Sequence, residues 1–184
     1  MSRAVEVTVQ YAALAERIAG LPPAPTDQGR VVLVVARPAI SERTTPARAR
    51  LTPEGGVEGD RWALREKRVF DTQVTVMRAD IAGVIANGQP IELAGDNLFV
   101  DLDLSYANLP PGTRLRVGTA LCEVTPKPHN GCDKFAARFG DDARAVTGAE
   151  EFRSWRLRGL HLRVVEAGDV GPGDKIYVLG RPAH

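Results

Sequence analysis

The sequence predicts a mostly-β fold, a barrel with a few short peripheral helices. The chain has 184 residues, of which 43% are hydrophobic and 26% charged, an ordinary balance for one globular domain. Its 18 glycines and 13 prolines lie between short apolar runs, as expected when turns separate many strands. Runs at residues 113–117 and 119–125 flank Gly118, which is typical of a β-hairpin. These features together favour a barrel.

The chain begins with an expected helix. Apolar residues at helical spacing within residues 5–19 predict a short helix that ends at Gly20 and the Pro22-Pro23 pair. We interpret residues 1–30 as this helix and a linker packed on the domain, and residues 31–180 as the barrel domain.

The remaining elements follow in order along the barrel domain. The unbroken apolar run at 31–36 predicts a strand that is covered on both faces. The glycine-rich turn after residue 166 predicts a closing hairpin that pairs 159–166 with 174–179. Further strands are expected at 48–51, 73–77, 95–101, 113–117 and 119–125, with a loop at 52–62 and helices at 78–87, 132–139 and 141–155.

The charge balance argues against several classes of partner. Lys and Arg total 24 against 23 for Asp and Glu, a formal net charge of +1, so nothing indicates nucleic acid or a membrane as a partner. No segment approaches the roughly 20 apolar residues of a membrane span. Residues 1–19 lack the unbroken apolar run of a signal peptide, so we expect a cytoplasmic protein. Two cysteines in a reducing compartment do not make a disulfide framework.

Cys132 is the strongest candidate for chemistry. It follows residues 128–131 (PHNG) and opens an expected helix, where the helix dipole and unpaired N–H groups favour a thiolate. Lys127, His129 and Lys134 add positive character nearby. A thiolate is the form of cysteine that ligates metals and attacks sulfur. The alternative is a small buried hydrophobic residue, as many free cysteines are.

The second cysteine and the other histidines are expected to be structural. Cys122 lies within an expected strand, on the face that alternation turns toward the core. His161 lies on another expected strand, and His184 is terminal and expected to be mobile. His129 and Cys132 have H-x-x-C spacing, but a structural zinc site needs further ligands that the sequence does not supply.

A glycine-rich loop at 55–62 is a candidate anion-binding site. Its three glycines, the last of them Gly59, permit unusual backbone conformations and leave N–H groups free for an anion. Asp60 follows, and Arg61 is suited to clamp a phosphate with help from Arg68. A plain turn with an Asp-capped corner is an equal alternative.

Asn97 is a third candidate, at the entry to the expected strand 95–101. An amide at that place suits a polar heterocycle, and it suits a turn equally well. The sequence contains no Ser-His-Asp order, Walker loop or dinucleotide fingerprint.

Four segments together resemble the MOSC domain family, which is named after the C-terminal domain of molybdenum cofactor sulfurase. Residues 56–61 (GVEGDR) are similar to the family's G-L-x-G-D-R loop, and residues 95–118 resemble its E-N-hydrophobic…L-x-x-G-x-R-L-x-I-G block. Residues 120–132 resemble its L-E-V-T…C element, and residues 158–178 its G-hydrophobic-V…G-x-V-x-x-G-D-x-V ending. The resemblance covers roughly residues 31–179.

The resemblance implies a barrel-like fold and, as in some family members, binding of the molybdenum cofactor (molybdopterin) through the motif cysteine. Carried over to this chain, Cys132 is the metal ligand or the site of a persulfide. Arg61 is then a contact for the cofactor phosphate and Asn97 a contact for the pterin. The rest of the expected cofactor-binding set consists of Gly59, Asp60, Arg68, Lys127, His129 and Lys134.

The chain also departs from the family pattern. Gly131 stands where many members have proline, Trp62 where many have histidine, and Asp96 in the usual place of glutamate. These differences suggest a stand-alone subgroup. Pyridoxal phosphate is not expected in this chain, because in the sulfurases a separate domain carries it.

Three functions remain open at this stage. The favoured one is a molybdenum-cofactor-dependent oxidoreductase that reduces N-hydroxylated or similar small substrates, with an electron-donor protein as a possible partner. The second is a sulfur carrier or sulfurtransferase, in which a Cys132 persulfide passes sulfur between a donor and an acceptor protein. The third is a non-catalytic binding module in which Cys132 has no chemical role.

Overall fold

The computed structural model describes residues 2–183, with side chains from Gln10 onward. His184, which we expected to be mobile, lies outside the described residues. The helices are α1 (Ser2–Ala19), α2 (Ala79–Ala86), α3 (Asp133–Phe139) and α4 (Asp141–Thr147). The strands are β1 (Gln28–Val34), β2 (Ala49–Thr52), β3 (Gly56–Val57), β4 (Val74–Arg78), β5 (Leu98–Asp101), β6 (Arg114–Val117), β7 (Ala120–Val124), β8 (Leu160–Glu166), β9 (Gly168–Val170) and β10 (Lys175–Gly180).

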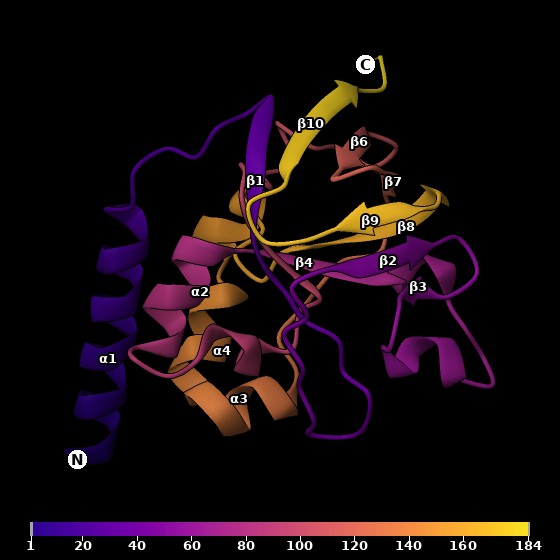
Figure 1. Ribbon diagram of the computed structural model, residues 1–184. Coiled ribbons are helices and arrows are strands. Elements are labelled where there is room, and N and C mark those ends of the chain that lie inside the picture. The colour runs from indigo at the N-terminus through magenta and orange to yellow at the C-terminus, as the bar shows by residue number, and fades with distance from the viewer. Residues whose placement is uncertain (1, 184) are drawn as a thin grey trace.

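Seven of these strands close into a barrel in the order β1-β10-β6-β7-β8-β4-β5 (Figure 1). The neighbouring strands are antiparallel, except for β4 and β5, which run parallel and are connected through α2. A separate three-stranded sheet has the order β3-β2-β9. The predicted mostly-β barrel with a few short helices is confirmed.

The last strands do not form the hairpin that we expected. β8 pairs with β7 and β4, whereas β10 pairs with β1 and β6. Between them, β9 leaves the barrel and pairs with β2 in the separate sheet. The prediction was wrong because a glycine-rich turn shows where the chain changes direction and not which strands become neighbours. β10 instead closes the barrel against the first strand.

Other expected elements needed smaller corrections. The run at 31–36 is not covered on both faces, because burial alternates along β1 and Val32 is 45% exposed. The expected helix at 141–155 is broken at Gly148 into α4 and a 3₁₀ helix, Glu150–Trp155. The expected loop at 52–62 contains the short strand β3 and the start of a 3₁₀ helix.

The interior of the barrel is filled by aliphatic side chains. Val76, Leu98, Leu115, Leu160 and Ile176 belong to one buried cluster at its centre. They leave a cavity of only about 10 Å³. A space of that size barely holds one water molecule, so any ligand must bind outside the barrel interior.

The helices cover the outer face of the same strands. Side chains alternate along a strand, so Met77 and Phe99 point outward where their neighbours point inward. They meet Ile18 of α1, Ile81 of α2 and Phe135 of α3 in a second buried cluster. Figure 1 shows the four helices gathered against one side of the barrel. None of the described helices combines the length and the apolar character needed to cross a bilayer.

Three strands bring their ends together where the candidate residues lie. Because β4 and β5 are parallel, Thr75 and Asn97 become neighbours, and the Asn97 N–H donates to the Thr75 carbonyl at 3.0 Å. β1 is antiparallel to β5, so its last residues meet the first residues of β5. Arg37 lies three residues after the end of β1 and belongs to the same region.

Candidate functional site

An ion pair between Arg37 and Asp60 organises one end of the barrel. Arg37 Nε donates to Asp60 Oδ2 at 2.7 Å and Nη2 donates to Oδ1 at 3.0 Å, a two-pronged arrangement typical of arginine and carboxylate. The Arg37 backbone N–H also donates to Oδ2, and the Trp62 N–H to Oδ1, both at 2.9 Å. Burial alone would raise the pKa of the Asp60 carboxyl, but the Arg37 guanidinium and these N–H donors together lower it.

Asn97 locks this ion pair in place. Its Nδ2 donates to Asp60 Oδ2 at 2.9 Å and to the Val35 carbonyl at 3.1 Å. Its Oδ1 accepts from Arg37 Nη2 at 3.1 Å and from Thr75 N at 3.1 Å. Both Asn97 and Asp60 are buried, and protein groups occupy their polar atoms. Where the sequence suggested direct contacts with a cofactor, the structure shows two residues that orient Arg37.

Three guanidinium groups converge on Gly95, which ends a 3₁₀ helix with φ of +85°. Arg37 Nη1 donates to the Gly95 carbonyl at 2.9 Å. A Cβ atom built on Gly95 would lie 3.3 Å from Arg43 Nη2 and 3.4 Å from Arg138 Nη1. A side chain at this position would press against both guanidinium groups and would need a positive φ, which favours glycine. We call the group formed by Arg37, Arg43, Arg61, Arg65 and Arg138 the arginine cluster.

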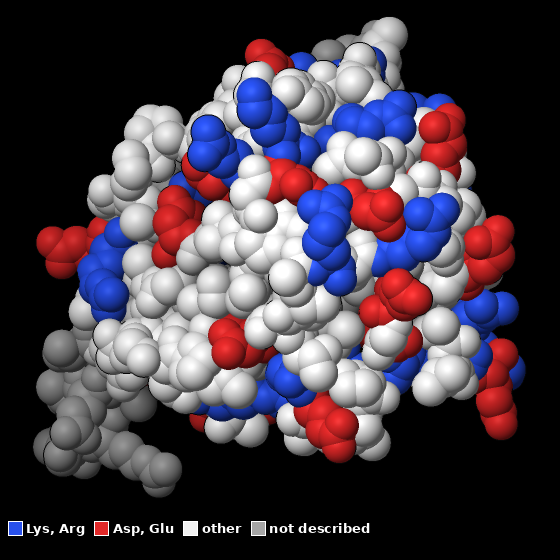
Figure 2. Space-filling model, viewed as in Figure 1, with Lys and Arg blue, Asp and Glu red and all other residues white. Residues whose placement is uncertain are grey.

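The arginine cluster holds more positive than negative charge. Burial lowers the pKa of Arg43, and repulsion from Arg138, Arg37 and Arg61 lowers it further, whereas Asp60 opposes the shift. The pKa of Arg65 is lowered for the same reasons, by burial and then by Arg37 and Arg61. On the face that Figure 2 shows, basic and acidic side chains are interspersed. The positive charge concentrated in the arginine cluster favours an anion.

A buried ion pair lies beside the arginine cluster. Asp96 is fully buried, and its Oδ2 accepts from Arg158 Nη1 at 2.5 Å. Arg158 Nη2 donates to the Ala94 carbonyl at 3.0 Å, and its guanidinium stacks over the Phe135 ring at 4.7 Å. Burial raises the pKa of Asp96, while Arg158 and then Arg37 oppose the change.

Two histidines lie next to each other, and one of them, His129, lies beside this ion pair. The rings of His129 and His161 are 4.5 Å apart, and His161 Nδ1 is 3.0 Å from the Lys127 carbonyl. His129 Nδ1 is 3.5 Å from Asp96 Oδ1, but the two atoms do not form a hydrogen bond and each lacks a partner among the described residues. Burial, followed by repulsion from Arg158 and His161, lowers the pKa of His129 well below 6.5. Burial also lowers the pKa of His161.

Cys132 lies on the loop that follows His129. It is exposed and occupies the position before α3, where its carbonyl accepts from the N–H groups of Phe135 and Ala136 at 3.0 Å. Three residues of chain reach at most about 11 Å, so the thiol stays near the buried histidines. Cys122 differs, because it is fully buried in the barrel core, as we expected.

Of the remaining predicted residues, some lie at the arginine cluster and one lies apart from it. Gly59 has φ of +80° and turns the chain into Asp60, whose side chain caps the next 3₁₀ helix. Arg61 donates its backbone N–H to the Arg37 carbonyl at 2.9 Å and belongs to the arginine cluster. Arg68 lies apart, donating to the Glu54 carbonyl at 2.8 Å and stacking near Trp62.

The two predicted lysines are exposed. Lys127 contributes its carbonyl to His161, and its side chain points to no partner that the structure identifies. Lys134 lies in the first turn of α3. Neither side chain forms an ion pair within the described part of the chain.

Sequence reasoning missed most of the residues that create the positive charge. Arg43, Arg65, Arg138 and Arg158 come from four segments that meet only in the folded chain. For Arg37 a signal exists, because it ends a long apolar run and a charged residue there must reach an edge of the core. Among the described residues, no group of three or more His, Cys, Asp or Glu side chains is placed to hold a metal ion.

Comparisons with known proteins agree with this architecture. The fold is similar to YiiM from Escherichia coli, with a TM-score of 0.57 and 21% identity over 84% of this chain and 72% of that chain. It is similar to the YuaD protein from Bacillus subtilis, with a TM-score of 0.55 and 18% identity over 81% of this chain and 94% of that chain. A crystal structure of a hypothetical protein gives a TM-score of 0.59 and 23% identity, with coverages of 84% and 68%. These similarities establish the fold alone.

Sequence comparison identifies the family. No curated protein matches the sequence. The MOSC domain, however, matches residues 71–177, which is more than half of the 184 residues. This segment includes the Asp96–Arg158 ion pair, the histidine pair and Cys132. The chain therefore belongs to the MOSC domain family.

Proposed function

We propose that this chain binds the molybdenum cofactor at the arginine cluster, with the Cys132 thiolate as a metal ligand. We further propose that it is an oxidoreductase acting on N-hydroxylated or similar small substrates. The observation that carries the proposal is the convergence of Arg37, Arg43 and Arg138 on Gly95. Such an excess of guanidinium groups over carboxylates destabilises the empty site and favours a phosphate-bearing ligand.

The donor groups present fit such a cofactor. Arg43 Nε is a buried atom without a hydrogen-bond partner among the described residues, so an anionic oxygen would satisfy it. The exposed Cys132 thiol is available as a single protein ligand. One ligand suffices for a cofactor that brings its own sulfur ligands to the metal.

The chain's own residues have distinct tasks in this proposal. Arg43, Arg61 and Arg138 bind the anionic group, and Asp60 and Asn97 hold Arg37 in place beside them. His129 stays uncharged because burial and Arg158 lower its pKa, so it adds no further repulsion to the cluster. The cofactor, when bound, would supply the redox chemistry, while the protein supplies binding and orientation.

A sulfur-carrier role remains the second candidate, because the exposed thiol of Cys132 also suits it. In that role, Cys132 attacks a donor persulfide and displaces the donor's thiolate. The terminal sulfur becomes a persulfide on Cys132, and an acceptor takes it in the reverse sense. This role requires no ligand at the arginine cluster. The two functions therefore predict different purified proteins, one carrying the molybdenum cofactor and the other carrying a persulfide on Cys132. A non-catalytic binding module requires neither the cofactor nor the persulfide.

The test measures metal, pterin and thiol state in the same preparation. The full chain is purified without oxygen from cells that make the cofactor, and molybdenum, pterin fluorescence and intact mass are recorded. We expect molybdenum and pterin in the wild-type chain. We expect the Arg43→Gln variant to lose pterin. We expect the Cys132→Ser variant to retain pterin and, in X-ray absorption spectra recorded at the molybdenum edge, to lose one sulfur ligand.

Arg50→Gln is the matched control, since Arg50 is an exposed arginine paired with Asp169 on the separate sheet. It should retain the wild-type content. A wild-type chain without molybdenum but with one additional sulfur atom on Cys132 would replace the proposal with the sulfur-carrier role. A chain that carries neither, when a known cofactor-binding protein from the same cells is loaded, would contradict both.

A further inference from the structure

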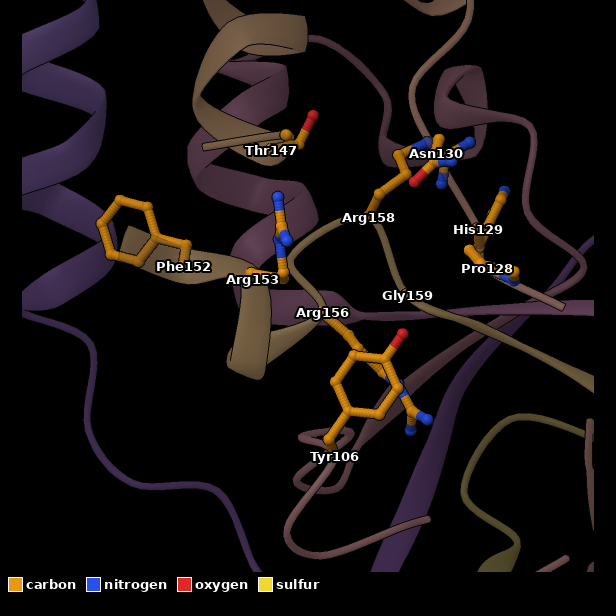
Figure 3. A pocket seen from close by; sticks show the side chains of 11 residues that line it. Tyr106, Pro128, His129, Asn130, Thr147, Phe152, Arg153, Arg156, Arg158 and Gly159 are labelled. Carbon is orange, nitrogen blue, oxygen red and sulfur yellow. The ribbon is translucent and has the colours of Figure 1, made fainter. Parts of the chain in front are cut away.

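A cavity outside the arginine cluster is lined by Tyr106, the loop before Cys132, the end of α4 and the segment before β8 (Figure 3). Its volume is about 320 Å³. Pockets for small organic molecules begin at roughly this size. None of the arginines around Gly95 lines it, so it is a separate space. The Asp96–Arg158 ion pair connects the two, because Arg158 lines the cavity and Asp96 follows Gly95.

The cavity wall is positively charged. Arg153, Arg156 and Arg158 all line it, and no acidic side chain does. Asp96 compensates Arg158, and the exposed Glu150 pairs with Arg153. Arg156 has no carboxylate partner within the described residues. It donates instead to the carbonyls of Leu104 at 3.2 Å and Leu109 at 2.6 Å, and its guanidinium lies 3.6 Å from the Tyr106 ring centre.

One buried nitrogen atom of the same wall lacks a hydrogen-bond partner among the described residues. Arg158 is 6% exposed, and its Nε donates to no acceptor, whereas His129 Nδ1 faces Asp96 Oδ1 at 3.5 Å. A buried donor without an acceptor is unfavourable, so such an atom in a cavity wall indicates a missing acceptor. An oxygen atom of a ligand would be an acceptor for Arg158 Nε.

The rest of the wall contains both polar and aromatic side chains. Asn130 and Thr147 contribute an amide and a hydroxyl, whereas Phe152 and Tyr106 contribute aromatic rings. In Figure 3, Arg158 extends toward Asn130, while Phe152 lies on the far side of Arg153. The combination suits a molecule with a charged end and an apolar body.

We propose that this cavity binds a small organic anion, with its oxyanion group facing Arg156 and Arg158 and its apolar body against Phe152. Carboxylates and phosphate monoesters share this chemistry. The inference does not depend on the molybdenum cofactor, and it assigns the cavity a ligand whether or not the arginine cluster holds one.

The test uses four probes of graded chemistry with the full chain as purified. Benzoate and phenyl phosphate carry both parts of the expected ligand, benzamide lacks the charge, and inorganic phosphate lacks the apolar body. Affinity is measured by titration, and the site is located from the shifts of the backbone amides of Asn130, Gly148 and Gly159 in nuclear magnetic resonance spectra. We expect benzoate or phenyl phosphate to bind at least about tenfold more tightly than benzamide.

Variants then separate a specific site from general attraction. Asn130→Asp keeps the size of an exposed side chain and adds a negative charge, so it should weaken binding of the organic anions about tenfold. Asn87→Asp is the matched control, because it makes the same change at an exposed position at the end of α2. Its affinities should equal those of the wild type.

Thermal unfolding of both variants reports whether the fold is intact, and Arg153→Gln at an exposed position provides a second test that should also weaken binding. Equal binding of benzoate and benzamide, shifts confined to other residues, or no binding at millimolar concentrations would each overturn the proposal. Tight binding of inorganic phosphate alone, with shifts around Gly95, would assign the anion to the arginine cluster. None of these outcomes depends on whether the chain binds molybdenum. The cavity proposal can therefore be refuted without refuting the proposed function.

Discussion

Arg37 grips both carboxylate oxygens of Asp60 while its remaining nitrogen, Nη1, donates to the Gly95 carbonyl. The pair is almost fully buried, with side-chain exposures of 11% for Arg37 and 1% for Asp60. One side chain thus joins the end of β1, the glycine-rich loop and the entry to β5.

Replacing Arg37 should therefore be strongly destabilising. The Arg37→Ala variant leaves the Asp60 carboxylate buried and without its cation, a situation that typically lowers the free energy of unfolding by about 3–5 kcal/mol. Urea unfolding of the purified chain measures the change. Arg30→Ala, at an exposed position on β1, serves as the control and should change stability by less than about 0.5 kcal/mol. Similar losses in the two variants would show that the ion pair does not hold this end of the barrel together.

The two thiols should react very differently. Burial raises the pKa of Cys122 to about 12 and the residue is fully buried, whereas Cys132 is exposed. Because the thiolate is the reactive form, a disulfide reagent should modify one thiol in the folded chain and both in denaturant. The Cys132→Ser variant should show no fast reaction when folded. Fast modification of Cys122 in the folded wild type would contradict this arrangement.

Acidification should destabilise the chain through His129. In the folded state the pKa of His129 lies well below 6.5, so the unfolded chain takes up a proton first as the pH falls. The contribution to stability is complete above pH 6.5 and is lost as the pH falls below it, by at most about 1.4 kcal/mol per pH unit.

Urea unfolding at pH 7.5, 6.5 and 5.5, roughly bracketing the ordinary histidine range, measures this effect. The His129→Gln variant should lose part of the pH dependence, and the part that remains includes His161 and Asp96. Their pKa values are shifted in opposite directions, that of His161 downward and that of Asp96 upward. Identical pH dependence in the wild type and the variant would show that His129 does not contribute.

Removing a charge from the arginine cluster should stabilise the unliganded chain. Arg43 is repelled by Arg138, Arg37 and Arg61, so Arg43→Gln relieves repulsion and should raise stability in low salt, on the order of 0.5 kcal/mol for such a partly exposed group. The same change should weaken the stabilisation that added phosphate gives the wild type. Melting curves with and without phosphate measure both effects. A variant that melts lower and still responds fully to phosphate would contradict an anion site at Gly95.

The sequence predicted the elements of the fold better than their partners. Alternation and glycine turns located most strands, because side-chain period and turn chemistry are local properties. The pairing of β10 with β1 depends on contacts between the two ends of the chain, and no turn signal encodes it. The helix that starts near Cys132 was predicted because its hydrogen bonds join residues close together in the sequence, so local sequence signals indicate it.

The candidate site was predicted in part for the same reason. Cys132 and the loop at Asp60 stand out in the sequence because each sits in a short segment with several unusual neighbours. Arg43 and Arg138 do not stand out in the sequence, because only the fold brings both of them close to Gly95. The Asn97 side chain forms hydrogen bonds with Val35 and Thr75, which are distant from it in the sequence and become its neighbours only in the folded chain.

The closure of the barrel by β10 against β1 has a consequence for biosynthesis. β10 is synthesised long after β1, and Arg158 lies 62 residues after Asp96 in the chain. While the chain is being translated, the first strand has no neighbour on that side, and Asp96 has no cation in its pocket. Folds dominated by such long-range pairings form slowly. A ligand that needs the closed barrel must therefore bind after residues 175–180 have been synthesised and have paired with β1.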